Sequence, residues 1–166
     1  MAISNQQVHD KLAELFPGAI LKEEQGDMLT LHIAKDKLHE LIKWLKNDDS
    51  FQINFLTLIG GIHFPNNQGH ELGVVYHLHS LTNNFRIRLK TFVPISHPHV
   101  PSIVDIYDSA NWQERETFDF FGIIFDHHPN LKRILNEDDM DYHPMRKEYA
   151  LEDATREDKD DRYFGR

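Results

Sequence analysis

The sequence predicts an α+β fold: a two-layer domain in which helices pack on a mixed, mainly antiparallel sheet, plus an extended charged C-terminal arm. Three observations predict it. Segments with apolar residues at helical spacing flank paired strand-like segments, and three longer strand-like runs fill the middle of the chain. Aliphatic residues become scarce from Asn136 onward. We therefore expect one domain at residues 1–135 and the arm at residues 136–166.

The first fifty residues predict two helices and a hairpin between them. Ser4 is a suitable N-cap for the first helix, which Pro17 and the glycine after it should end. Residues 19–24 and 28–33 are strand-like and are joined by a turn-rich spacer, which suits a hairpin. Leucine and isoleucine then recur at helical spacing over residues 35–47, which predicts the second, amphipathic helix.

The middle of the chain predicts three strands, at residues 51–64, 71–81 and 84–93. In the third run, Ile87 and Leu89 alternate with three cations, so one face should be buried and the other wet or paired with acids. These cations are Arg86, Arg88 and Lys90.

An irregular connection should follow, because Pro94, Pro98 and Pro101 interrupt any regular element. The spacing of apolar residues then predicts a third helix over residues 103–121. Gly122 fits the C-terminus of this helix, and periodicity fades beyond it.

Composition excludes several classes of protein. The chain of 166 residues has no cysteine, so it holds no disulfide framework and no thiolate-bound zinc or iron–sulfur cluster. Its 18 basic and 27 acidic residues give a net charge of −9, which disfavours nucleic acid as a partner. Apolar runs are too short to span a membrane, and residues 1–10 do not resemble a signal peptide. We expect any membrane association to come through partners.

Charges of both signs stand among aromatic residues between Glu114 and Gly122. Arg115 and Asp119 are four residues apart on the predicted helix, so a local ion pair is expected between them. Glu114 and Glu116 could suggest an acid–base pair, but residues two apart on a helix point in different directions. Their predicted role is therefore structural.

Histidines offer a competing interpretation. His77 and His79 should share one face of a strand, and His97 and His99 flank a proline, so a four-histidine metal site is conceivable. No acidic ligand accompanies them, and we expect no metal site. His128 precedes Pro129, which predicts an extended turn.

Two blocks of sequence resemble the 30 kDa subunit family of respiratory complex I. The first block begins with Glu-Arg-Glu at residues 114–116, continues with an acid and two large apolar residues at 119–121, and ends with His-Pro-x-Leu-Lys-Arg-Ile at 128–134. The second block is His-Pro-Met-Arg-Lys-Glu-Tyr at residues 143–149. Tyr142 replaces a glycine that is usual in the family. The signature and interface residues implied are Glu114, Arg115, Glu116, Asp119, Gly122, His128, Pro129, Arg133, Pro144, Arg146 and Lys147.

The resemblance implies a structural subunit of the peripheral arm of a proton-translocating NADH:quinone oxidoreductase. It implies no catalytic residue and no cofactor in this chain, with FMN, iron–sulfur clusters and quinone bound by partner subunits. The implied partners are subunits B, D and I, on the cytoplasmic side of the bacterial inner membrane. The alternative is the equivalent subunit of a membrane-bound hydrogenase or a ferredoxin-dependent oxidoreductase. A stand-alone histidine-rich metal enzyme is the third hypothesis.

Residues 136–166 allow two interpretations, a solvated tail or an arm that orders against a neighbouring subunit. The resemblance favours the arm. Its candidate anchors are the scattered large apolar side chains Tyr142, Met145, Tyr149, Tyr163 and Phe164.

Overall fold

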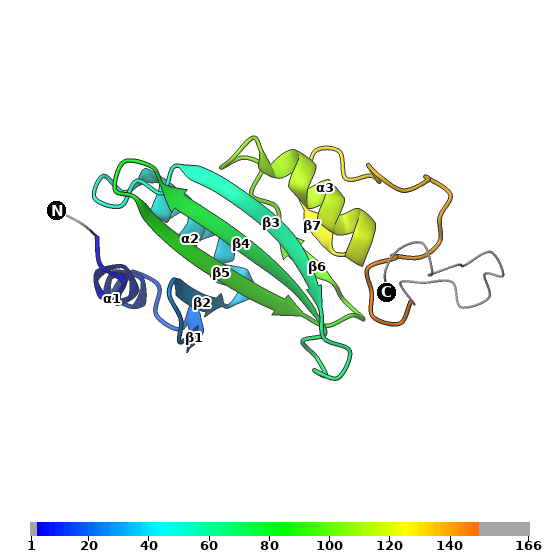
Figure 1. The fold of residues 1–166 in the computed structure, drawn as a ribbon, viewed down its shortest axis with the longest axis horizontal. Helices are drawn as coiled ribbons and strands as arrows, with labels where there is room; N and C mark the ends of the chain where they lie inside the picture. Colours follow the sequence, from blue (N-terminus) through cyan, green and yellow to red (C-terminus); the bar gives the residue numbers. More distant parts are fainter. Residues whose placement is uncertain (1–2, 150–166) are drawn as a thin grey trace, which may run out of the picture.

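The computed structural model describes residues 3–149, and these form helices and two sheets. Figure 1 shows the long central strands with α1 and α2 on one side of the molecule and α3 beside β3. In chain order the elements are α1 (Asn5–Leu15), β1 (Ile20–Glu24), β2 (Leu29–Ile33), α2 (Lys35–Asn47), β3 (Phe55–His63), β4 (Leu72–Ser80), β5 (Phe85–Val93), β6 (His99–Pro101), α3 (Ala110–Phe121) and β7 (Ile124–Asp126).

The main sheet has the strand order β1-β2-β5-β4-β3. Only the β2–β5 contact is parallel within it, and β1–β2, β3–β4 and β4–β5 are antiparallel. The parallel contact arises because the chain crosses from β2 through α2 before it returns to the sheet. The predicted α+β fold with a mixed, mainly antiparallel sheet is confirmed.

The N-terminal half agrees with the sequence prediction because its signals are local. Ser4 caps α1 and forms a capping box with Gln7, each side chain accepting a hydrogen bond from the other residue's backbone N–H. The predicted hairpin is β1 and β2, and the predicted second helix is α2, with the expected bounds.

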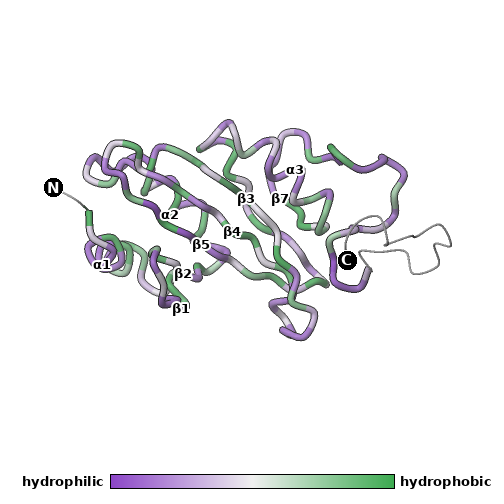
Figure 2. Tube along the Cα trace, viewed as in Figure 1, coloured by the Kyte–Doolittle hydropathy of each residue, from purple (hydrophilic) through white to green (hydrophobic). Residues whose placement is uncertain are grey.

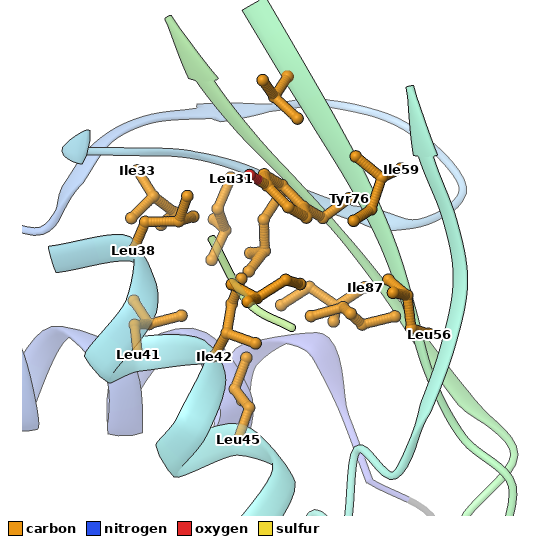
Figure 3. Close-up of a cluster of buried hydrophobic side chains, with 14 of the residues drawn as sticks. Leu31, Ile33, Leu38, Leu41, Ile42, Leu45, Leu56, Ile59, Tyr76 and Ile87 are labelled. Atoms are coloured by element: carbon orange, nitrogen blue, oxygen red, sulfur yellow. The ribbon is translucent and has the colours of Figure 1, made fainter. Parts of the chain in front are cut away.

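The apolar core lies between α2 and the inner face of the main sheet. Figure 3 shows the side chains of α2 pointing at residues that come from several strands. The helix contributes Leu38, Leu41, Ile42 and Leu45, all fully buried. The strands contribute Leu31, Ile33, Leu56, Ile59, Tyr76 and Ile87, each at most 4% exposed.

The alternation predicted in β5 is also confirmed. Ile87 and Leu89 are fully buried on the inner face, whereas the three cations that alternate with them point to the opposite, outer face. Figure 2 shows the same alternation as hydrophilic and hydrophobic colours that follow one another along the strand. In Figure 1, α2 lies behind the sheet as viewed, so the outer face is turned toward the reader.

Two boundaries predicted from the sequence are wrong, and one strand pair was not predicted. The third helix begins at Ala110 rather than near Ile103, because Ile103 to Tyr107 form a separate turn in which Ile103 O accepts two backbone hydrogen bonds. Strand β3 begins at Phe55 rather than at Phe51, since Gln52 has a positive φ of 46°. The short parallel pair β6–β7 was not predicted, because three-residue strands leave no periodic pattern.

Within residues 3–149, no helix combines the length and the apolar character that a membrane span requires.

Candidate functional site: the clamp along α3

The charged side chains of α3 differ in how deeply they are buried. Glu114 and Asp119 are fully buried and Arg115 is nearly so, whereas Glu116 is exposed. The two glutamates therefore point apart as predicted, and they do not form an acid–base pair. We call the contacts that α3 makes with residues 128–147 the clamp.

Asp119 is the centre of the clamp. Its Oδ1 accepts hydrogen bonds from Arg133 Nη1 at 2.7 Å and from Asn136 Nδ2 at 3.0 Å. Its Oδ2 accepts three backbone N–H groups, from Ile134 at 3.1 Å, Leu135 at 2.8 Å and Asn136 at 2.9 Å. A single buried carboxylate thus holds three consecutive residues of the segment that follows β7.

The predicted ion pair between Arg115 and Asp119 is wrong. Asp119 pairs with Arg133, while Arg115 donates from Nε to Lys132 O at 3.1 Å and from Nη2 to Arg133 O at 3.0 Å. The guanidinium of Arg115 also lies 5.3 Å from the centre of the Trp112 ring. Arg115 and Asp119 therefore both bind the returning segment instead of each other, because partners outside the helix satisfy them better than an i,i+4 neighbour.

Arg133 extends the contacts farther along the chain. Its Nη2 donates to the carbonyl oxygens of Met140 at 2.6 Å and Tyr142 at 2.8 Å, while its Nη1 reaches the backbone oxygen of Asp119 at 3.1 Å. One planar guanidinium thereby ties α3 to a loop that has no regular structure of its own.

The pKa of Asp119 reflects these contacts. Burial alone would raise it, but the hydrogen bonds donated by Asn136, Leu135 and Ile134 hold the pKa of Asp119 well below its usual range. The carboxylate is therefore charged at physiological pH, which the pairing with Arg133 requires.

Glu114 is buried in a different environment. Its Oε1 accepts the Ile103 N–H at 2.8 Å and its Oε2 accepts the Ser102 hydroxyl at 2.7 Å, so it fixes the end of β6 to α3. Burial raises the pKa of Glu114 to about 7, against the opposing effect of these two hydrogen bonds. No cation accompanies it within residues 3–149, which distinguishes it from Asp119.

The second block of the resemblance lies against the C-terminal end of α3. His143 Nδ1 donates to Asp119 O at 3.0 Å, Met145 N–H to Phe120 O at 3.1 Å, and Arg146 Nε to Phe121 O at 2.8 Å. The last carbonyl groups of the helix, which lack partners inside it, are therefore capped by residues from the following segment.

Gly122 has the role predicted for it. It ends α3 in the left-handed conformation with φ of 72°, and a Cβ there would lie 2.5 Å from His143 Cδ2 and 2.6 Å from Arg146 Nη2. Only glycine permits both the backbone conformation and this close approach.

The remaining signature residues surround these contacts. His128 Nε2 donates to Asn111 O at 3.1 Å and its Nδ1 accepts the Asn130 N–H at 3.0 Å, so both ring nitrogens are satisfied in the neutral form. Burial lowers the pKa of His128 and of His143. Pro129 lines a cavity of about 420 Å³ beside His39 and Asp105.

The second His-Pro block continues to the sheet. Pro144 lies in the turn before Met145, and the backbone N–H of Lys147 donates to His63 Nδ1 at 2.9 Å. The rings of Tyr142 and Tyr149 lie 4.9 Å apart, and Tyr142 does not take the positive φ that a glycine would permit. Tyr163 and Phe164 lie outside the described residues.

The four candidate histidines do not assemble into one site. His97 and His99 stack on each other at 4.3 Å, and His99 Nδ1 lies 2.7 Å from Asp126 Oδ1, whereas His77 accepts from Arg88 Nε at 3.1 Å. Within residues 3–149 no group of three or more histidine, aspartate or glutamate side chains is arranged to hold a metal ion.

Several residues that contact α3 or the clamp segment escaped the sequence prediction. Ser102, His63 and Asn136 are joined to these segments by residues distant in the sequence. Gly61 also has a packing role, because a Cβ there would lie 2.2 Å from Cδ2 of Phe121 on α3. Its only sequence signal was a pair of glycines in a strand, which often marks close approach of another segment.

The fold and the clamp define a protein whose charged motif holds its own C-terminal segment in place. Residues 31–155 match the family described as "Respiratory-chain NADH dehydrogenase, 30 Kd subunit". The chain belongs to this family.

Individual relatives agree. The chain is 44% identical over 149 residues to the C subunit of the NADH-quinone oxidoreductase of Acidothermus cellulolyticus, covering 87% of this chain and 78% of that protein. It is 47% identical over 123 residues to the corresponding protein of Nocardioides sp., covering 74% and 49%. The chain thus spans about half to three quarters of the length of these relatives.

Solved structures share the fold. A trypsin-resistant fragment of Nqo5 matches with a TM-score of 0.65 and 27% identity, over 77% of this chain and 100% of the fragment. A chain of a membrane-bound sulfane sulfur reductase, an archaeal respiratory membrane complex, matches with a TM-score of 0.73 and 23% identity, over 88% and 85%. The second likeness concerns the fold alone.

Proposed function

We propose that this chain is the structural 30 kDa-type subunit of the peripheral arm of a proton-translocating NADH:quinone oxidoreductase. The observation that carries the proposal is the family match over residues 31–155. The names of the curated relatives favour this function over the equivalent subunit of a hydrogenase or a ferredoxin-dependent oxidoreductase. The chain supports the passage of electrons from NADH to quinone without carrying them itself.

In this role, FMN, iron–sulfur clusters and quinone belong to partner subunits, and the chain binds none of them. Its partners are subunits B, D and I, and the complex holds it at the cytoplasmic side of the bacterial inner membrane. Residues 1–135 are the proposed domain and residues 136–166 the proposed arm, of which residues 136–146 contact α3 of the same chain. The absence of cysteine is consistent with a subunit that carries no cluster.

Exposed apolar side chains on the clamp supply a contact surface. Trp112 and Leu135 are 58% and 64% exposed, although the backbone of Leu135 is fixed by Asp119. Met145 and Tyr142 are also exposed. Large apolar side chains held on a rigid backbone are typical of the centres of protein interfaces. The signature residues therefore serve the interface indirectly, because they position the side chains that make contact.

Purification from the native membrane tests the proposal. We expect the tagged chain to bring down the cluster-bearing subunits, and its deletion to abolish NADH:quinone activity in membranes. Recovery of the tagged chain as a free monomer, together with an intact active complex lacking it, would refute the function.

A matched pair of variants tests the contact surface. Leu135→Asp should lower incorporation into the complex about tenfold or more, since a charge in an interface core disfavours burial. Leu21→Asp is the control, because Leu21 is 65% exposed on β1. Equal incorporation of the two variants, measured on native gels, would show that the clamp is not the contact surface.

A further inference from the structure

The outer face of the main sheet is the second surface of interest. Helix α2 packs on the inner face, and Figure 1 shows the long strands β3, β4 and β5 in front of it. Alternate residues of each strand therefore point outward, as the cross-strand pairs Leu58–His77, His77–Arg88 and Arg88–Thr30 indicate. The outward residues used below are Phe55, Leu58, His77, His79, Arg86, Arg88 and Lys90.

Positive charge gathers on this face although the chain as a whole has a net charge of −9. Lys90 is neutralised by Glu24, with Nζ and Oε2 2.6 Å apart, and Glu24 Oε1 also lies 2.6 Å from His32 Nε2. Arg86 and Arg88 have no carboxylate partner among residues 3–149. Two guanidinium groups on the same face of one strand therefore retain their charge.

The histidines of β4 add unused hydrogen-bonding capacity. Arg88 Nε donates to His77 Nε2 at 3.1 Å, which leaves other N–H groups of the guanidinium available. His79 Nε2 is buried and has no hydrogen-bond partner within the part of the chain that the structure describes. A buried ring nitrogen without a partner is costly, and a partner group from outside would satisfy it.

Apolar side chains border the cations on the side of β3. Phe55 and Leu58 are 46% and 48% exposed, on a strand rather than in a mobile loop. A cavity of about 250 Å³ opens beside the charges, lined by Phe55, Thr57, His77, His79 and Arg86 among others. One ligand that carries both carboxylates and an apolar side chain can therefore contact the cations and the apolar border of this face at the same time.

We propose that this outer face docks an acidic polypeptide segment of a partner subunit. The segment places carboxylates against Arg86 and Arg88 and sets an apolar side chain beside Phe55. Charge complementarity identifies the occupant, because paired guanidinium groups bind carboxylates in a fixed geometry. This inference rests on the proposed function, since it needs a complex in which such a partner exists.

Charge reversal gives the first test. Arg86→Glu combined with Arg88→Glu should lower incorporation of the chain into the membrane complex about tenfold or more, with a larger loss at low than at high salt. The control is Lys43→Glu, an exposed cation on α2 in the opposite layer. Circular dichroism of the purified variants checks that both fold. Incorporation equal to that of the control would overturn the proposal.

Photo-crosslinking gives the second test and identifies the occupant. Leu58→benzoylphenylalanine is introduced into the chain, the intact complex is purified and irradiated, and the attached peptide is sequenced. We expect a partner peptide with a net negative charge. A neutral or basic peptide, a lipid adduct or no adduct would overturn the proposal. Co-purification of the variant with the complex separates these outcomes from failure of the proposed function.

Discussion

The apolar core and the clamp are both buried, but different forces hold them. In the core, leucine and isoleucine side chains of α2 pack on the sheet, and the interaction has no preferred direction. In the clamp, Asp119 and Arg133 bind named backbone atoms at fixed distances. A core of this kind tolerates changes that conserve volume, whereas a clamp depends on individual atoms. Four predictions test this difference, from the largest expected effect to the smallest.

The largest loss should come from Asp119→Ala. It leaves Arg133 buried without its carboxylate and frees three backbone N–H groups, so the free energy of unfolding should fall by about 3–5 kcal/mol. Glu116→Ala, at an exposed position of the same helix, should cost less than about 0.5 kcal/mol. Urea unfolding measures both, and similar values for the two variants would contradict the prediction.

The core should respond to volume rather than to chemistry. Leu41→Ala should cost about 3 kcal/mol, because it opens a cavity at a fully buried position, whereas Leu41→Met should cost less than about 1.5 kcal/mol. The two tryptophans report the two regions separately by fluorescence, Trp44 packing between Phe16 and Phe51 and Trp112 lying on α3. If Leu41→Met lowered the free energy of unfolding as much as Leu41→Ala, the core would depend on the individual side chain, as the clamp does, and not on volume alone.

Glu114, which joins α3 to the residues after β6, should make the stability of the protein sensitive to pH. Its pKa is raised in the folded protein to about 7 from 4.5, so protonation favours folding. This stabilisation is complete below about pH 4.5 and is lost as the pH rises to about 7. Relative to Glu114→Gln, the wild type should therefore lose about 2 kcal/mol between pH 5 and pH 8.

The subtraction isolates Glu114, because His128 and His143 are present in both proteins. Urea unfolding at several pH values provides the measurement. A difference that does not change with pH would show that Glu114 stays ionised without penalty.

The smallest effect should come from the contact between the sheet and α3. Gly61→Ala should cost about 1–2 kcal/mol, since its Cβ would collide with the Phe121 ring at 2.2 Å. Gly60→Ala is the control on the neighbouring residue, where a Cβ would meet nothing within 4 Å. Thermal unfolding of both variants measures the difference, and equal midpoints would mean that α3 shifts to accept the methyl group.

The structural features that could be predicted from the sequence are those determined within a single short segment. The apolar stripe of α2, the cap at Ser4 and the alternation in β5 were each readable within one element, and each is confirmed. The start of α3 was not, because Glu114 holds Ile103 in a separate turn. The parallel pair β6–β7 was missed because its three-residue strands leave no periodic pattern and its partners are distant in the sequence.

The candidate site was likewise predictable only in part: its residues could be selected from the sequence, but their partners could not. The resemblance singled out Asp119, Arg133 and Arg146 as signature and interface residues, and in the structure all three bind groups outside their own element. Their partners could not be derived, because helical spacing suggested Arg115 for Asp119 while the actual partner is 14 residues away. Backbone acceptors such as Met140 O carry no sequence signal at all.

The parallel contact between β2 and β5 has a consequence for the order of folding. This contact pairs Leu31 with Leu89, and the whole of α2, β3 and β4 lies between these two residues in the sequence. Asp119 and Arg133, in contrast, are separated by only 14 residues. Closing a longer loop costs more entropy, and distant contacts slow folding. The charged contacts along α3 are therefore available early, and pairing of β2 with β5 should limit the rate at which the whole molecule reaches its native state.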